Sequence, residues 1–161
     1  MVEKIEKQCA AVTVCVGLLV GVAALQAQTP NAPTLSANMK GSWTNIRDLV
    51  TKMAEKMPEE NYRFKATPEL QDFGQRMAHT AAFMMRGCAT VKGEQKTLNV
   101  SDRGTPKKAE ILAALKEATA ECDAVFNPLT DADLMKPIAG GRGGPRLAQA
   151  ILQGTVLEHS Q

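Results

Sequence analysis

The sequence predicts an all-α protein, an antiparallel up-down four-helix bundle in which the last helix is cut short. Three observations lead to this expectation. Apolar residues recur at spacings of three and four in four segments after residue 40. Capping residues and prolines bound most of these segments. No stretch alternates β-branched and polar residues as a half-buried strand would. Helices joined by short to moderate loops are the components of such a bundle.

The first forty residues differ in composition from the rest of the chain. No charged residue occurs between Lys7 and Lys40, and the segment Cys9–Leu25 consists of apolar and small residues. This pattern predicts a secretory signal peptide over residues 1–27, cleaved after Ala24 or Ala27. The apolar segment also reaches the lower limit for a membrane span, about 17 residues, so an uncleaved N-terminal anchor is the alternative.

A signal peptide implies an exported protein, periplasmic or secreted. We predict a linker over residues 28–40 and a single helical domain over residues 41–161. The chain carries a net charge of +2, and removal of the leader takes away two lysines and two glutamates and leaves that charge unchanged. Proteins that bind nucleic acid usually have a much stronger and more localised positive charge, so we exclude that class.

The first two helices of the domain begin at recognisable caps. Gly41-Ser42 starts the first helix, which runs to about Lys56. The second starts at Thr67-Pro68, a hydroxyl cap followed by proline at the first helical position, and closes near residues 88–91. The expected core face of the first helix comprises Trp43, Ile46, Leu49, Val50, Met53 and Met57.

The third helix is expected from Thr105-Pro106 to about Phe126, followed by a capped single turn over residues 129–134. A glycine-rich connector over residues 140–145 leads to the fourth helix, which starts at Pro145. That helix is shorter than its partners, and its apolar register runs to the last residues without a C-terminal cap. We therefore expect the sequence to be truncated relative to its natural relatives.

Two cysteines remain once the leader is removed. Cys88 and Cys122 lie 34 residues apart, a disulfide candidate in an oxidising compartment. Two buried thiols packed as small apolar groups are the alternative. A catalytic thiol is the least favoured interpretation, because no histidine or basic cluster adjoins either cysteine in the sequence.

The two histidines, His79 and His159, are the candidate metal ligands. Each lies at the edge of an apolar stripe, on the second and the fourth expected helix respectively. Side chains that face the core of a bundle from two helices can share a metal ion. Spacing alone favours a simpler interpretation, in which each histidine is a hydrogen-bonded residue at the core boundary. No motif identifies a catalytic residue.

Several segments resemble a known family. They are residues 43–49, MPEENYRFKATPELQDFGQRMAHTAAF at residues 57–83, KKAEILAALKEATAECDAVF at residues 107–126, LTDADLMKPI at residues 129–138, and the closing ILQGTVLEHS. Over about residues 40–160 the chain resembles the DinB-like (DinB/YfiT) superfamily, in particular its exported branch.

The resemblance implies an antiparallel four-helix bundle with a divalent metal ion, Zn²⁺ or Ni²⁺, held by three histidines. One comes from the second helix and two come from the fourth, four residues apart. His79 matches the first ligand and His159 the first of the later pair. The third would fall four residues after His159, beyond the last residue of this sequence. The resemblance also implies that Cys88 and Cys122 form the disulfide of the exported branch.

Two hypotheses for function follow. The first is a metal-dependent hydrolase or thiol transferase, or an inactive relative of one, which would take a small-molecule ligand or a thiol. The second is a non-catalytic, exported, disulfide-stabilised bundle that acts as a binding or structural protein. Both hypotheses allow the protein to form a homodimer. In both, the protein would contact a membrane only through an uncleaved N-terminal segment.

Overall fold

The computed structural model describes residues 32–139 and 144–160. Three long helices, α2 (Leu35–Lys56), α3 (Phe73–Val91) and α4 (Lys108–Phe126), form most of the bundle. A 3₁₀ turn, η2 (Glu59–Arg63), follows α2, and the short helix α5 (Asp131–Leu134) follows α4. The predicted signal peptide at residues 1–27 lies outside the described residues. No helix in the described part of the chain is long and apolar enough to cross a membrane.

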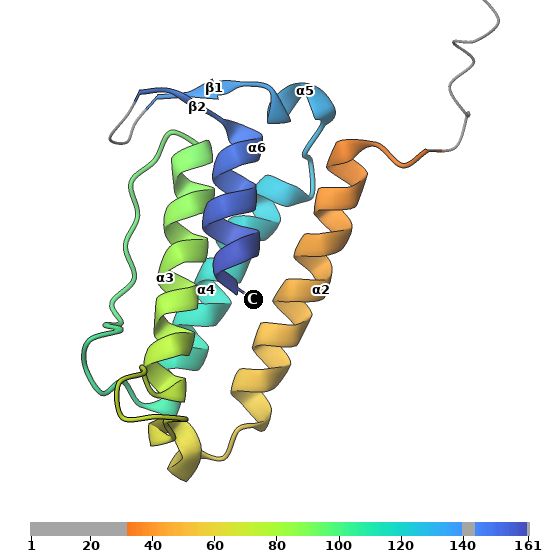
Figure 1. The fold of residues 1–161 in the computed structure, drawn as a ribbon. Coiled ribbons are helices and arrows are strands. Elements are labelled where there is room, and N and C mark those ends of the chain that lie inside the picture. The colour runs from red at the N-terminus through yellow and green to blue at the C-terminus, as the bar shows by residue number, and fades with distance from the viewer. Residues whose placement is uncertain (1–31, 140–143, 161) are drawn as a thin grey trace, which may run out of the picture. The chain divides into compact units, whose positions relative to one another are not determined.

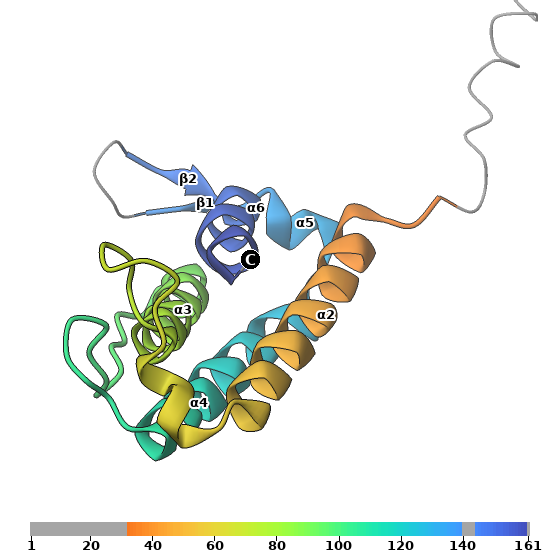
Figure 2. The same cartoon turned by 60° about the horizontal axis from the view of Figure 1, so that its bottom comes forward.

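The fourth position in the bundle is taken by a composite helical segment. It consists of one α-helical turn, α6 (Ala148–Ile151), a π-helical stretch, η3 (Leu152–Leu157), and a 3₁₀ turn, η4 (Glu158–Ser160). Figures 1 and 2 show this segment packed against α3 on one side and facing α2 on the other, and ending about half-way along them. The all-α bundle with a short last helix is therefore confirmed.

A small sheet precedes the last helix, and the sequence did not predict it. Strand β1 (Pro137–Ile138) pairs antiparallel with β2 (Arg146–Leu147). The expected start of the fourth helix at Pro145 is wrong, because Arg146 and Leu147 are extended in this pairing and Ala148 donates its backbone N–H to Lys136 O at 2.9 Å. Part of the predicted glycine-rich connector, residues 140–143, lies outside the described residues.

Helix α2 begins seven residues earlier than predicted. The Thr34 hydroxyl caps it by accepting the Ala37 N–H at 3.2 Å, and Ser36 N–H donates to Asp131 Oδ1 of α5 at 2.8 Å. Residues 35–40, which we expected in a linker, are therefore helical. Gly41 lies inside the helix and supplies no cap.

Helices α3 and α4 begin later than predicted. In α3 the cap is Asp72, whose Oδ1 accepts the Gln75 N–H at 2.7 Å while Gln75 Oε1 accepts the Asp72 N–H at 3.0 Å. This reciprocal capping box satisfies two unpaired helix donors and outcompetes Thr67-Pro68, which forms only a turn. Helix α4 starts after Lys107, whose N–H donates to Glu110 Oε2 at 2.7 Å.

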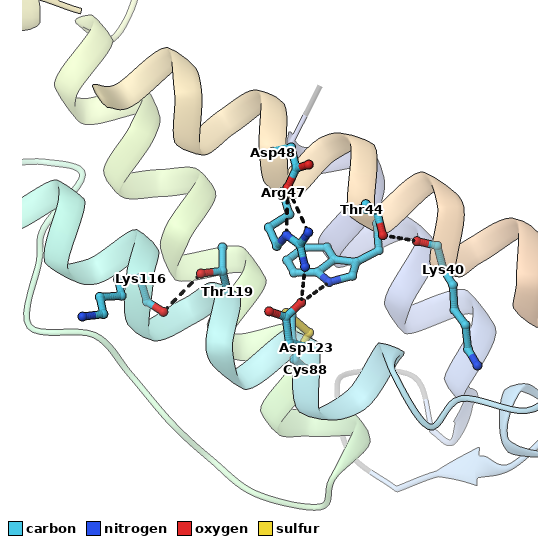
Figure 3. Close-up of polar contacts among 10 residues, drawn as sticks. Lys40, Thr44, Arg47, Asp48, Cys88, Lys116, Thr119 and Asp123 are labelled. Carbon is cyan, nitrogen blue, oxygen red and sulfur yellow. Dashed lines mark hydrogen bonds and ion pairs between the residues drawn. A yellow bond between two sulfur atoms is a disulfide. The ribbon is translucent and has the colours of Figure 1, made fainter. Parts of the chain in front are cut away.

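The core joins all four positions of the bundle. Trp43 of α2 stacks on Phe126 of α4 with ring centroids 5.1 Å apart, and both side chains are fully buried. Asp123 on α4 accepts hydrogen bonds from the Trp43 indole and from Arg47, and Figure 3 shows the Arg47 contact beside Asp48. These contacts fix α2 on α4. The last helix packs on α3 instead, and that packing depends on Gly87.

The last helix approaches α3 closely at Gly87. A Cβ added at Gly87 would lie 2.7 Å from Cγ2 of Val156, closer than side-chain atoms approach one another. Only glycine lets α3 and η3 pack at this separation. The close packing brings the C-terminal turn, with His159, onto the surface of α3 near His79.

The prediction that Leu49 and Met53 face the core is wrong. Leu49 is 57% exposed and Met53 is 42% exposed, whereas Trp43 and Val50 on the same helix are buried. The described C-terminal segment faces the N-terminal half of α2 (Figure 1), whereas Leu49 and Met53 lie in the C-terminal half of that helix. Both side chains line a pocket there.

Candidate functional site

The two predicted candidate ligands lie close together in the structure. His79 on α3 and His159 on η4 have ring centroids 6.2 Å apart. Phe83, one turn after His79, contacts both rings, at 4.4 Å from His79 and 4.0 Å from His159, where the two rings are stacked. The aromatic contact orients both imidazoles on the same side of α3.

The δ nitrogen of His79 is held by a carboxylate. Nδ1 lies 2.7 Å from Oδ2 of Asp102, which belongs to the long loop between α3 and α4. An ionised carboxylate can only accept, so Nδ1 carries the hydrogen and donates it. In the neutral ring, Nε2 then keeps its lone pair. This is the arrangement in which a metal-binding histidine is oriented by an acidic neighbour.

The δ nitrogen of His159 is held in the same way by a backbone carbonyl. Nδ1 lies 2.7 Å from O of Gly154, five residues earlier, and a carbonyl oxygen can only accept. His159 is therefore also protonated on Nδ1, with its Nε2 lone pair available. Both candidate residues thus present the same nitrogen as a potential ligand.

The two rings lie slightly too far apart to share a tetrahedral ion without moving. With Zn²⁺–N bonds of about 2.0–2.1 Å, two imidazole centroids on a tetrahedral ion would lie roughly 5.2 Å apart. The observed centroid distance is 6.2 Å, so the rings would have to approach by about 1 Å to bind one ion together. Among the described residues, no group of three His, Cys, Asp or Glu side chains converges on one point. The described chain thus offers two imidazole ligands here.

A pocket of about 770 Å³ opens beside His159, between α2, α3 and η4. Its polar lining comprises Arg76, Thr80, Glu158 and His159. Its apolar lining comprises Ile46, Leu49, Val50, Met53, Phe73 and Met77. The volume is in the range of small-molecule sites, and an apolar wall with a few polar groups is typical of them.

A positive charge contacts the same aromatic ring. The Arg86 guanidinium carbon lies 4.0 Å from the centroid of the Phe83 ring, in cation–π geometry. Arg86 is exposed, and it contacts the Phe83 ring in addition to the two histidines. It therefore helps hold the ring that supports both imidazoles.

The cysteines lie apart from the histidines, between α3 and α4. Cys88 and Cys122 are fully buried and at disulfide distance, with Cα atoms 5.2 Å apart. A crosslink here closes the polar loop that carries Asp102. Sequence reasoning missed Asp102 and the Gly154 carbonyl. Asp102 stands in a polar loop with no helical spacing to His79, and a backbone acceptor leaves no trace in the sequence.

Comparison with known proteins gives a fold and a family. The crystal structure of a conserved protein from Enterococcus faecalis matches with a TM-score of 0.60 at 11% identity, covering 80% of this chain and 92% of that one. No curated protein matches. The family model of the DinB superfamily matches residues 42–161, which is most of the chain, so the protein belongs to the DinB superfamily.

Proposed function

We propose that this protein binds a divalent metal ion, Zn²⁺ or Ni²⁺, through His79 and His159, and that it acts as a metal-dependent hydrolase or thiol transferase on a ligand in the adjoining pocket. The observation that carries the proposal is the matched state of the two imidazoles. Each donates its Nδ1–H at 2.7 Å and leaves Nε2 as a ligand, from rings 6.2 Å apart.

The residues around the pair have separable roles. His79 and His159 would hold the ion, and Asp102 and the Gly154 carbonyl fix their tautomers and orientations. A bound divalent ion would supply Lewis-acid activation of a water or a thiol. The pocket residues Arg76 and Glu158 would orient a small molecule beside His159. Metal affinity should therefore depend on the oriented rings.

The predicted leader and the cysteine pair support a proposal about where the protein is located. The predicted leader would deliver the domain to an oxidising compartment, where the Cys88–Cys122 pair can form its crosslink. We propose a periplasmic or secreted protein on this basis. The mass of the protein purified from the exported fraction tests it, because removal of residues 1–24 or 1–27 gives two distinct masses.

Titration calorimetry with Zn²⁺ and Ni²⁺ tests metal binding on the full chain. We expect Asp102→Asn to weaken binding by about 10–100-fold, the usual effect of removing a carboxylate that orients a histidine ligand. His79→Ala and His159→Ala should weaken it by at least as much. Asp48→Asn is the matched control, since Asp48 binds Arg47 and lines no part of the pocket. Equal affinities in all five proteins would overturn the proposal.

A second candidate function is favoured by the pocket itself. Its lining is mostly apolar and its volume suits a small molecule, independently of any metal. A non-catalytic bundle stabilised by the Cys88–Cys122 crosslink would use this pocket to bind a ligand. Binding of a ligand that is unaffected by chelators and by His79→Ala would support this candidate.

A further inference from the structure

A separate pocket of about 410 Å³ lies beside the last turns of α3, where the small sheet meets the C-terminal segment. Its lining includes Arg86 and Thr90 of α3, Arg146 of β2, and Thr155 of η3. Figure 1 shows the C-terminal segment starting at the sheet and running away from it along α3. All residues of the lining lie at or before Thr155, so the first turns of that segment form this wall. We call it the arginine pocket.

The two arginines of this pocket have no carboxylate partner. Neither Arg86 nor Arg146 forms an ion pair within residues 32–139 and 144–160. Residues 140–143, which adjoin β2 in the sequence, are Gly-Gly-Arg-Gly and contain no acid. Arg146 donates one hydrogen bond, from Nη2 to Ala150 O at 3.1 Å, out of the five N–H donors of a guanidinium group. Both arginines therefore keep N–H donors for a ligand.

The acidic residue of the lining, Glu94, is already paired with lysines. Its Oε1 lies 3.3 Å from Lys92 Nζ, and its Oε2 lies 2.7 Å from Lys96 Nζ. The last carbonyl groups of α3 are occupied as well, because the backbone N–H groups of residues 92–94 donate to them. The two arginines are thus needed neither to neutralise Glu94 nor to cap α3.

We propose that the arginine pocket binds a phosphate group, as inorganic phosphate or as the head group of a small phosphate ester, between Arg86 and Arg146. The paired N–H donors of a guanidinium group match the oxygen atoms of phosphate. The hydroxyl groups of Thr90 and Thr155 and the amide of Gln95 line the same pocket. In the part of the chain that the structure describes, none of these three side chains forms a hydrogen bond. They add further donors for the phosphate oxygens.

The donors of this pocket suit a phosphate better than a carboxylate. A phosphate monoester carries a charge of about −1.5 to −2 at neutral pH and has three strong acceptor oxygens. A carboxylate has one charge and two oxygens. Two guanidinium groups from separate elements supply two positive charges, which one carboxylate would only half neutralise. Ile151 adds an apolar side chain to the lining, and the volume is in the range of small-molecule sites, so an ester with a small organic group can enter.

Titration of the full chain with glycerol phosphate and with inorganic phosphate, in the presence of a metal chelator, tests the proposal. We expect Arg146→Gln to weaken binding of both by at least about tenfold, because it removes charge-assisted hydrogen bonds. Arg146→Lys keeps the charge but loses the paired donors, so it should recover only part of the affinity. Arg103→Gln is the matched control, since Arg103 is an exposed arginine outside this pocket.

The second arginine and the hydroxyl groups have their own variants. Arg86→Gln should weaken binding as Arg146→Gln does, and Thr90→Val/Thr155→Val should weaken it by about tenfold while keeping the side-chain shape. Thr97→Val is the control for the hydroxyl groups, because Thr97 is exposed and lies outside the pocket. Arg86→Gln also removes the cation–π contact with Phe83. If thermal unfolding shows that this variant does not fold, Arg146→Gln, which leaves that contact intact, decides the question.

The outcomes separate this proposal from metal binding. Phosphate binding that persists with chelator and in His79→Ala supports the arginine pocket whether or not the histidines hold an ion. Tighter binding of glycerol phosphate than of inorganic phosphate would identify an ester as the ligand, and equal binding would identify free phosphate. Binding that is absent, that is lost in His79→Ala, or that is equal in Arg146→Gln and Arg103→Gln would overturn the proposal. Tighter binding of malonate than of either phosphate would overturn it in favour of a dicarboxylate.

Discussion

The indole N–H of Trp43 donates a 2.8 Å hydrogen bond to Oδ1 of Asp123, and the same oxygen accepts a 3.0 Å bond from Arg47. Trp43 is 1% exposed, so without Asp123 its indole nitrogen would be buried without an acceptor. The Asp123 carboxylate on α4 thereby fixes the position of α2, whose Leu49 and Met53 line the pocket. Figure 3 shows the Arg47–Asp123 contact.

We predict that Asp123→Ala lowers the free energy of unfolding by about 1–3 kcal/mol, the cost of leaving a buried donor unsatisfied. Urea denaturation followed by circular dichroism measures it. Asp48→Ala is the control, because Asp48 binds Arg47 but not Trp43 and is half-exposed. Its expected change is within about 0.5 kcal/mol. Equal effects of the two substitutions would contradict a special role for the Trp43 contact.

Two glycine substitutions should have opposite signs. Gly87→Ala places a Cβ 2.7 Å from Val156 Cγ2 and should cost about 1–3 kcal/mol by overpacking. Gly41→Ala, in the exposed middle of α2 with no atom within 4 Å of the added Cβ, should stabilise by about 0.5–1 kcal/mol. Thermal unfolding measures both. A neutral Gly87→Ala would show that α3 and η3 do not pack as closely as described.

Reduction of the Cys88–Cys122 crosslink should destabilise the fold. A loop closed over 34 residues is worth about 3–4 kcal/mol in the loop-entropy model. Mass spectrometry without reductant should show a deficit of two hydrogens, and denaturation with and without reductant should differ by that free energy. The Cys88→Ser/Cys122→Ser variant, which should not respond to reductant, is the control. Two alkylatable thiols in the protein as purified would contradict the crosslink.

Stability at acid pH should depend on Glu121. Hydrogen bonds from Lys92 at 2.7 Å and Lys96 at 2.8 Å lower the pKa of Glu121 below its ordinary value. Because the folded pKa is the lower one, the contribution is present above the unfolded pKa and is lost as pH falls through the folded pKa. The free energy of unfolding of Glu121→Gln should therefore converge with that of the unmodified chain in acid.

Glu117→Gln is the control for this pH dependence, since Glu117 is exposed on the same helix and forms no ion pair among the described residues. Denaturation curves between pH 7 and acid pH, compared across the three proteins, measure the effect. A gap between Glu121→Gln and the unmodified chain that is independent of pH would show that the lysine contacts do not act through this titration.

The sequence predicted the helices through their apolar period but not all of their ends. Helices α4 and α3 end at Phe126 and Val91, and the sequence predicted both ends. The start of α3 moved because the Asp72 and Gln75 side chains reciprocate, and two plausible caps five residues apart cannot be ranked from composition alone. Leu49 and Met53 were assigned to the core because periodicity does not reveal how far a neighbouring helix extends.

The site was predicted in part. His79 and His159 were identified from the family pattern, and the structure places them 6.2 Å apart. Their partners were not predicted, because Asp102 approaches from a loop 23 residues away and Gly154 contributes only its backbone. The fourth helix was expected to be regular, yet its π-helical stretch sets the position of His159.

The central claim is that both imidazoles present Nε2 to a shared ion. The chain has only two histidines, so the imidazole ¹⁵N resonances of the full protein can be assigned with one His79→Ala spectrum. Before metal addition, both rings should be Nδ1–H tautomers. On addition of Zn²⁺, the Nε2 resonances of both should shift together. Unchanged Nε2 resonances at saturating Zn²⁺, or a shift in one ring alone, would contradict the account.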